Sequence, residues 1–265
     1  MMKLEIDFTK KATENATDYF EAAKKAKRKL EGLKKGIEAA ELKIKATQNI
    51  EKKELKKKRE KKWYEKFRWF FTSEGLLAIG GKDATSNEKI INNYMKENDI
   101  YFHADIHGAA HIILKCEKSP NENSLKETAI FAAVHSKAWQ EKIPTIDVYS
   151  AKPTQITKKA PTGETLPKGA FMVYGERTWY KKTKLSYAIG AKKEGEEIEI
   201  FAGPESAIEK KADAIVKLTF GNKKKSDCAK KIAWILSTKL KTEIKDKLDE
   251  IIALLPNGES EIEED

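Results

Sequence analysis

Cysteine and long hydrophobic stretches are both scarce in this chain of 265 residues. The two cysteines, Cys116 and Cys228, stand alone and far apart, so they offer neither a disulfide framework nor the paired spacing of a zinc site. No apolar run approaches the roughly 20 residues that cross a membrane, and the N-terminus lacks the apolar segment of a signal peptide. These absences predict a cytoplasmic protein with reduced thiols and no membrane association.

Positive charge is abundant but confined to one segment. The whole chain carries a formal charge of +10, whereas residues 24–68 alone hold 19 Lys and Arg against 7 Glu, a net of +12. Such a concentration favours a polyanionic partner such as RNA, DNA or an acidic membrane surface. The alternative is a solvated, lysine-rich helix of the kind that heat-adapted proteins use.

Apolar residues recur at alternating steps of four and three through the first part of the chain. This repeat, which averages 3.5 residues, predicts a long helix with a coiled-coil seam after a short extended segment at residues 3–8. The seam consists of Ala12, Ala16, Tyr19, Ala23, Ala26, Leu30, Leu33, Ile37, Ala40 and Ile44.

We expect the seam to stop at a turn over residues 47–49. A second helix is predicted over residues 51–70, with Trp63, Phe67 and Phe70 on one face. Residues 1–70 should therefore form an antiparallel helical hairpin, in effect a coiled-coil arm with a lysine-rich part.

Beyond residue 70, short apolar runs alternate irregularly with helical patterns. Strands are predicted at 76–79, 100–104, 111–115, 145–149, 171–174, 185–189, 197–201 and 214–220, and helices at 85–97, 124–141, 226–240 and 241–255. This order predicts an α+β fold, a mixed sheet with packed helices. We expect a folded domain at 71–190, an α/β extension packed on it at 191–256 and a disordered acidic tail at 257–265.

His103, Asp105 and His107 alternate at the end of a predicted strand. The two-residue period of a strand would place all three on one face, where they could hold a metal ion that activates water, as in a metal-dependent nuclease. The interpretation we favour is a hydrogen-bonded cluster that shapes a binding face, in which Asp105 orients the histidines.

Two further stretches carry residues of the kind that contact phosphate. Gly80, Gly81 and Lys82 precede a predicted helix whose free N–H groups could cradle a phosphate, although a plain turn fits as well. The long loop that follows residue 151 carries Lys158 and Lys159 among threonines. Lysine and hydroxyl groups are common phosphate ligands, although an ordinary solvated loop has the same composition.

Several stretches together resemble one family. Four of them resemble the RNA-binding R domain of NFACT proteins, a family that includes NEMF, RqcH and the fibronectin-binding-protein-like homologues. These stretches are KKWYEKFRWFFTSEGLLAIGGKDATSNEKIINNYM, YFHADIHGAAHIILK, FAAVHSKAW and QITKKAPTGETLPKGAFMVYGERTWY. The upstream segment, with Asn15-Ala16 followed by Tyr19, resembles the middle coiled coil of that family. The resemblance covers about residues 3–190, and the Lys and Glu richness resembles archaeal members.

The resemblance implies a role in ribosome-associated quality control. Family members bind large ribosomal subunits that still carry peptidyl-tRNA after stalling, and they help recruit aminoacyl-tRNA for untemplated tailing. The implied partners are the large subunit, rRNA, tRNA and other quality-control proteins. Family members also carry an N-terminal domain and a helix-hairpin-helix module, where tRNA recognition largely resides. We therefore expect this chain to be part of a longer or split protein, and we carry over RNA and ribosome binding alone.

The sequence thus predicts a non-catalytic RNA-binding module without a cofactor. The residues predicted to form its RNA-binding face are Lys56, Lys57, Lys58, Arg68, Lys82, His103, Asp105, His107, Lys158, Lys159 and Arg177. The alternatives are a metal-dependent nuclease that uses His103, Asp105 and His107, and a protein–protein scaffold whose coiled coil meets a partner.

Reversing the charge of Lys56, Lys57 and Lys58 tests the role of the basic arm. We expect the triple Glu variant to bind RNA more weakly without losing its fold, because phosphate contacts depend on positive charge. The measurement is affinity for tRNA at several salt concentrations, with circular dichroism as the folding control. Unchanged affinity would remove the arm from the RNA-binding face.

Overall fold

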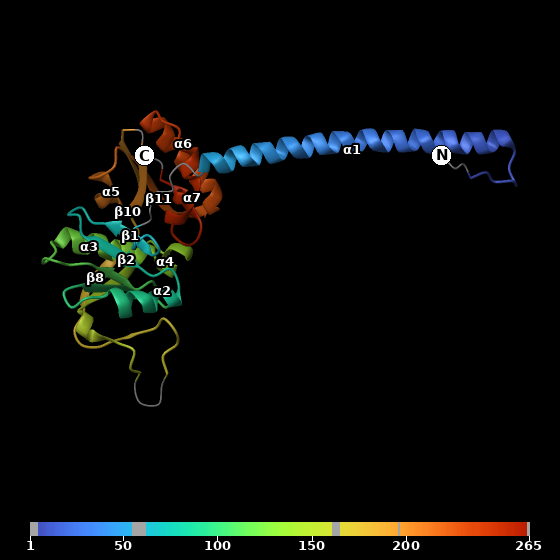
Figure 1. Ribbon diagram of the computed structural model, residues 1–265. Helices are drawn as coiled ribbons and strands as arrows, with labels where there is room; N and C mark the ends of the chain where they lie inside the picture. The colour runs from blue at the N-terminus through green and yellow to red at the C-terminus, as the bar shows by residue number, and fades with distance from the viewer. Residues whose placement is uncertain (1–4, 55–61, 161–164, 196, 264–265) are drawn as a thin grey trace. The chain divides into compact units, whose positions relative to one another are not determined.

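The chain divides into two compact units, Met1–Lys61 and Lys62–Asp265 (Figure 1). The computed structural model describes residues 5–54, 62–160, 165–195 and 197–263. Within these residues, none of the helices combines the length and the apolar character that a bilayer span needs. The boundary between the units falls before Trp63, so the aromatic segment predicted as the end of the arm belongs to the second unit.

The first unit consists mainly of one helix, α1 (Ala12–Glu54). It continues without interruption through residues 47–49, so the turn predicted there is wrong. Thr, Gln and Asn cost a helix interior well under about 1 kcal/mol each, and neither Gly nor Pro is present to stop it. The second helix is also wrong in its last part, because Arg68–Phe71 forms a strand. Lys56, Lys57 and Lys58 lie outside the described residues.

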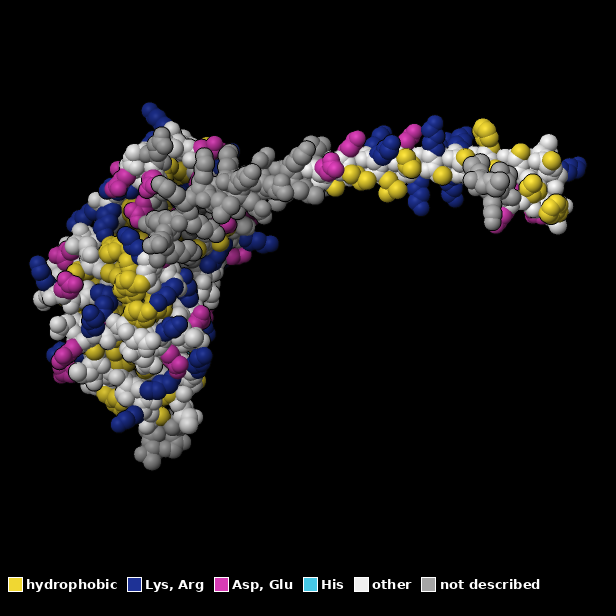
Figure 2. Space-filling model, viewed as in Figure 1, with side chains coloured by type: hydrophobic (Ala, Val, Ile, Leu, Met, Phe, Trp, Pro, Cys, Tyr) yellow, Lys and Arg dark blue, Asp and Glu magenta, His cyan; other side chains and the backbone are white. Residues whose placement is uncertain are grey.

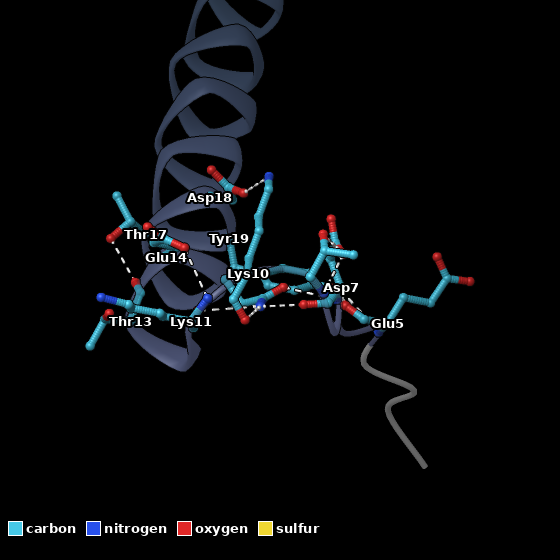
Figure 3. A network of polar contacts seen from close by, with 11 residues as sticks. Glu5, Asp7, Lys10, Lys11, Thr13, Glu14, Thr17, Asp18 and Tyr19 are labelled. Carbon is cyan, nitrogen blue, oxygen red and sulfur yellow. Dashed lines mark hydrogen bonds and ion pairs between the residues drawn. The ribbon is translucent and has the colours of Figure 1, made fainter.

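The start of α1 is held by the segment that precedes it (Figure 3). The Asn15 side chain accepts a hydrogen bond from the Asp7 N–H and donates one to the Asp7 carbonyl, each at 2.9 Å. The Tyr19 hydroxyl likewise accepts from the Glu5 N–H at 3.0 Å and donates to its carbonyl at 2.5 Å. Asn15 and Tyr19 therefore pair with the extended backbone as a neighbouring strand would, which explains their spacing in the sequence.

The predicted seam of α1 is exposed. Leu30, Leu33 and Ile37 keep 55%, 60% and 58% of their surface accessible, and Figure 2 shows apolar side chains at the surface along the helix between Lys and Arg. The long helix predicted by the heptad pattern is thus confirmed, whereas the hairpin is not formed by the described residues.

The second unit contains a six-stranded antiparallel sheet with the order β1-β2-β4-β3-β5-β8. Its strands are β1 (Arg68–Phe71), β2 (Leu77–Gly80), β3 (Ile100–Ala104), β4 (Ile112–Leu114), β5 (Thr145–Ala151) and β8 (Thr178–Lys184). Strand β8 was not predicted, because its sequence TWYKKTK is mostly polar. It lies at the edge of the sheet, where a strand can remain largely exposed.

A second antiparallel sheet has the order β10-β9-β11-β12, with β9 (Tyr187–Glu194), β10 (Glu197–Pro204), β11 (Ala214–Lys223) and β12 (Ser260–Ile262). A short pair joins β6 (Ile156–Thr157), which lies within the predicted long loop, to β7 (Met172–Val173), which confirms the strand predicted at 171–174. Strand β9 crosses the predicted boundary between residues 190 and 191, so the extension is continuous with the domain before it.

The helices of the second unit are α2 (Ala84–Lys89), the π-helical turn η1 (Ile90–Tyr94), α3 (Glu122–Val134), α4 (Lys137–Gln140), η2 (Pro153–Gln155), α5 (Glu205–Glu209), α6 (Lys225–Leu240), η3 (Lys245–Lys247) and α7 (Leu248–Leu254). The helix predicted over 124–141 divides at Ser136, whose hydroxyl caps α4 by accepting from the Ala138 N–H at 3.1 Å. The α+β class predicted from the sequence is confirmed.

The six-stranded sheet is buried on both faces. On one face, Phe102 and Ile112 pack with Phe131 of α3 in a core that continues into the second sheet. On the other face, Ile79, Tyr101 and Ile113 pack against aromatic residues of the 62–67 segment, the isoleucines of η1 and the loop around Phe171. The layers that cover the two faces differ, because the four-stranded sheet lies only on the face that packs against α3.

The acidic tail was predicted to be disordered, but residues 257–263 are ordered and include strand β12. Ser260 is fully buried in β12, which pairs with β11, and its hydroxyl accepts from the Trp139 indole N–H at 3.1 Å. In ESEIE every second residue is Glu, so Ser260 and Ile262 share the opposite face of the strand, but a single apolar residue is too weak a pattern to predict a strand.

Replacing Ser260 with Ala should lower the free energy of unfolding by about 1–3 kcal/mol, because the buried Trp139 N–H would lose its acceptor. The measurement is urea denaturation. In a Trp139→Phe background the same replacement should cost much less, because the donor is already gone. Equal costs in the two backgrounds would mean that the indole–hydroxyl bond contributes nothing.

Candidate nucleic-acid interface

The turn between β3 and β4 carries the predicted polar cluster. It is held by hydrogen bonds from the Asp105 N–H to the Asp147 carbonyl and from the Ile106 N–H to the Ala104 carbonyl, both at 2.8 Å. Beside it lies a shallow hollow of about 290 Å³ lined by His103, Ala104, Asp105, Ile106, His107 and Tyr149. The structure therefore brings the three predicted residues to one place, open to solvent.

The three residues do not form the metal site of the predicted nuclease. Strand β3 ends at Ala104, so Asp105 and His107 lie in the turn and do not share a strand face with His103. Among the residues that the structure describes, no group of three or more His, Cys, Asp or Glu could hold a metal ion. Burial lowers the pKa of His103 to about 4, because desolvation outweighs the opposing attraction of the Asp105 carboxylate.

A chain of buried hydrogen bonds lies behind the hollow. The His111 Nε2 is 2.9 Å from the Gly169 carbonyl, which can only accept, so this nitrogen carries the proton. Its Nδ1 must then accept from the Tyr101 hydroxyl, 2.6 Å away. The chain ends at Tyr101, whose ring centroid lies 6.4 Å from that of Tyr149. It thus connects the loop that contains Gly169 to the buried Tyr101 of β3.

This chain lies against the wall of the hollow. Burial lowers the pKa of His111 to about 3, so the ring is neutral at physiological pH and needs no counter-ion. Tyr149, which lines the hollow, is 7% exposed and packs against His103 and Tyr101, with ring centroids 5.8 and 6.4 Å away.

Aromatic and basic side chains continue the wall across β5 and β8. Tyr149 pairs in register with Trp179, and their ring centroids are 5.3 Å apart. The Arg177 guanidinium lies 4.5 Å from the Tyr149 ring, and the Lys181 Nζ lies 4.2 Å from the Trp179 ring. Cation–π contacts of this kind and exposed aromatic rings are typical of single-strand nucleic-acid binding surfaces.

Trp179 and Lys181 belong to the edge strand β8, and Arg177 directly precedes that strand; their contacts with each other and with Tyr149 place all three on one surface. Arg177 was predicted from the sequence, whereas Trp179, Lys181 and Tyr149 were missed. The alternation Arg-x-Trp-x-Lys was visible in the sequence, but without a predicted strand there it had no structural meaning.

Three predicted basic residues lie elsewhere or have other partners. Arg68 donates to the Gly81 carbonyl at 3.1 Å and lies 3.4 Å from the His135 ring, and burial lowers its pKa. The Lys158 Nζ binds the Glu88 carboxylate at 2.8 Å and two loop carbonyls, at 3.0 and 3.1 Å. These side chains hold the fold together. Lys159 is exposed on the loop and lies apart from β8 in sequence.

The segment around Lys82 does not form an open phosphate cradle. The Ser86 hydroxyl accepts from the N–H groups of Lys82 and Asp83, both at 2.8 Å, and the Asp83 carboxylate accepts from the Ser86 N–H. Gly81 is needed for packing instead, since a Cβ there would lie 1.8 Å from the Asn87 Oδ1. The Lys82 side chain is exposed at the start of α2, and no feature of the described surface links it to the hollow.

Comparison with known proteins places these features in context. Residues 66–175 match the family model described as NFACT protein RNA binding domain. The archaeal Rqc2 homolog aRqcH of Methanocaldococcus jannaschii is 39% identical over 212 residues, which cover 79% of this chain and 31% of that protein. Further relatives are the ribosome quality control complex subunit NEMF homolog of Drosophila melanogaster (35% over 195 residues, 70% of this chain and 20% of that protein) and NEMF of Mus musculus (37% over 182 residues, 64% and 17%). The chain spans less than a third of the length of each.

Replacing His111 with Gln should flatten the pH dependence of stability. Because the folded pKa lies below the unfolded value, the unfolded state binds more protons and stability falls as pH drops below about 6.5. Removing this residue's titration should reduce the loss between pH 7 and pH 5 by about 2 kcal/mol.

The measurement is urea denaturation at both pH values. The matched control is Tyr101→Phe, which breaks the hydrogen bond to His111 but leaves the histidine buried. It should be less stable at pH 7 and should keep the wild-type pH dependence. A Gln variant with undiminished pH dependence would contradict the assignment.

Proposed function

The chain belongs to the NFACT family, and we propose that its second unit is an RNA-binding module of a ribosome quality-control factor. The module engages large ribosomal subunits that still carry peptidyl-tRNA after stalling, in the cytoplasm. Its ligands are rRNA and tRNA, and it binds them without catalysing a reaction. Three relatives whose names refer to ribosome quality control or to Rqc2 support this assignment.

The observation that carries the proposal is the position of the hollow and its basic, aromatic rim. His103, Asp105, His107 and Tyr149 lie within the stretch that matches the RNA-binding domain, and Arg177 follows that stretch directly. Basic groups meet phosphates and exposed rings meet bases, and beside the hollow the 39% exposed ring of Trp179 lies next to Arg177 and Lys181, so one surface offers both kinds of contact.

Charge alone would not distinguish this surface from the rest of the molecule. Exposed lysines are common here, and many of them form surface ion pairs, for example Lys245 with Glu243 at 2.8 Å. Arg177 differs because it is held in place: its Nη2 donates to the Val173 carbonyl at 3.0 Å while the guanidinium lies against Tyr149. A planar, oriented guanidinium is suited to a phosphate or to the face of a base.

A second candidate function, a protein–protein scaffold, is favoured by the exposed seam of α1. Leu30, Leu33 and Ile37 present an apolar stripe that a partner helix would bury in a coiled coil. This function concerns the first unit and is compatible with RNA binding by the second.

A salt series of binding to tRNA and to purified large ribosomal subunits tests the proposal. Wild-type affinity should fall steeply with salt, because bound cations are released from the RNA, and the RNA should be recovered intact. Arg177→Gln should weaken binding to both RNAs and lower the slope of log affinity against log salt by about one.

The matched control is Lys245→Gln, which removes one charge from a side chain that is 86% exposed and lies on η3. It should leave the affinity near that of the wild type. Salt-independent binding, or equal effects of the two variants, would contradict the proposed interface, and cleaved RNA would contradict a role limited to binding.

A further inference from the structure

On the basis of the proposed function, we infer that the exposed ring of Trp179, packed against the buried Tyr149, is a stacking platform for an unpaired RNA base, with Arg177 and Lys181 meeting its flanking phosphates. The ligand class is therefore single-stranded RNA, such as a loop or an end, rather than a duplex. This goes beyond RNA binding in general, because it names the part of the RNA and the residues that recognise it.

The backbone brings the rings together in one cross-strand row. His103 of β3 pairs with Tyr149 of β5, and Tyr149 pairs with Trp179 of β8. The ring centroids are 5.8 Å apart in the first pair and 5.3 Å in the second. Directly opposed residues of neighbouring strands point to the same face, so the row ends in an aromatic surface at the edge of the sheet.

The exposure of Trp179 sets it apart from the other aromatic residues of the sheet. The indole is 39% exposed, whereas Tyr101, Phe102 and Phe70 are almost completely buried. Buried Trp139 gives its N–H to Ser260 and packs against Tyr187 and Phe220. An indole on an edge strand that contacts one tyrosine and one lysine contributes little to the core, so its exposed area is available to a ligand.

Tyr149 supports the platform from behind. It is 7% exposed, and the Arg177 guanidinium lies 4.5 Å from its ring. The Trp179 ring packs against this buried tyrosine, so the indole is restrained on that side before a base arrives and loses less conformational freedom on binding. Lys181 is the part of the rim that must rearrange.

Lys181 covers the indole in the free protein but is weakly held. Its side chain is 64% exposed, and its ion pair with the Asp147 carboxylate, at 2.9 Å, is at the surface. Exposed ion pairs contribute less than base–aromatic stacking does. A base can therefore take the place of the ammonium group over Trp179, and the ammonium group can move to the adjacent phosphate.

Only unpaired RNA fits this surface. Bases inside a duplex are stacked on their neighbours and do not offer a face, whereas splayed-out bases of loops and ends do. Stacking on an aromatic ring tolerates any base, so we expect weak sequence preference and a clear preference for single strands.

The test compares a fluorescently labelled single-stranded oligoadenylate of about 10 nucleotides with an RNA duplex of equal length, using the full chain at low salt. Trp179→Ala should lower affinity for the single strand about 5- to 150-fold and leave the duplex affinity unchanged. Trp179→Phe should restore most of the loss. Trp234→Ala is the matched control, because this tryptophan is 68% exposed on α6, and it should bind as the wild type does.

The salt slope separates stacking from charge. Trp179→Ala should keep the wild-type slope, since it removes no phosphate contact. If the wild type binds RNA and Trp179→Ala binds the single strand equally well, the platform is wrong and the proposed function stands. If the wild type binds neither the single strand nor the duplex, the proposed RNA-binding function itself is contradicted. A loss shared equally by single strand and duplex would also overturn the inference.

Discussion

Burial of one sheet on both faces is the constraint on which the second unit depends. The strands β2, β3 and β4 read LAIG, IYFHA and IIL, and most of their residues are buried. A sheet of this kind must be covered twice. Helix α3 and the second sheet cover one face, while the 62–67 segment, η1 and the loop before β7 cover the other. The second covering stops short of β8, and the proposed interface is the surface that is left uncovered there.

Placing polar groups inside such a sheet requires complete hydrogen bonding. His111 and Tyr101 are both buried, yet each has a defined partner, because His111 bonds the Gly169 carbonyl on one side and the Tyr101 hydroxyl on the other. An unsatisfied group at either position would cost about 1–3 kcal/mol. The same bonds tie the loop that contains Gly169 to the sheet, so the polar residues of the motif first stabilise the fold. Only its exposed members, Asp105 and His107, are available to a ligand.

The elements that could be predicted from the sequence are those whose stability comes from apolar periodicity. The heptad pattern predicted α1, and short apolar runs predicted β2, β3 and β4. The elements that were missed depend on pairing: β8 and β12 are polar edge strands, stabilised by backbone bonds to a neighbour that the sequence does not reveal. The predicted site divides in the same way. The turn residues were found from their spacing, whereas Trp179 and Lys181 became significant only when β8 placed them beside Tyr149.

Net charge accounts for attraction to a polyanion, whereas recognition of a particular RNA depends on the geometry of the binding groups. The net charge of residues 24–68 acts over distances limited by a screening length of about 8–10 Å in physiological salt, and it favours any polyanion. Several lysines that looked like ligands are already bound, such as Lys158 to Glu88. Discrimination among RNAs needs groups held in fixed geometry, and Arg177 and Tyr149 are held so by hydrogen bonds and ring contact. The residues that attract RNA and the residues that select among RNAs can therefore lie in different parts of one chain. The position of the selecting residues cannot be inferred from the distribution of charge.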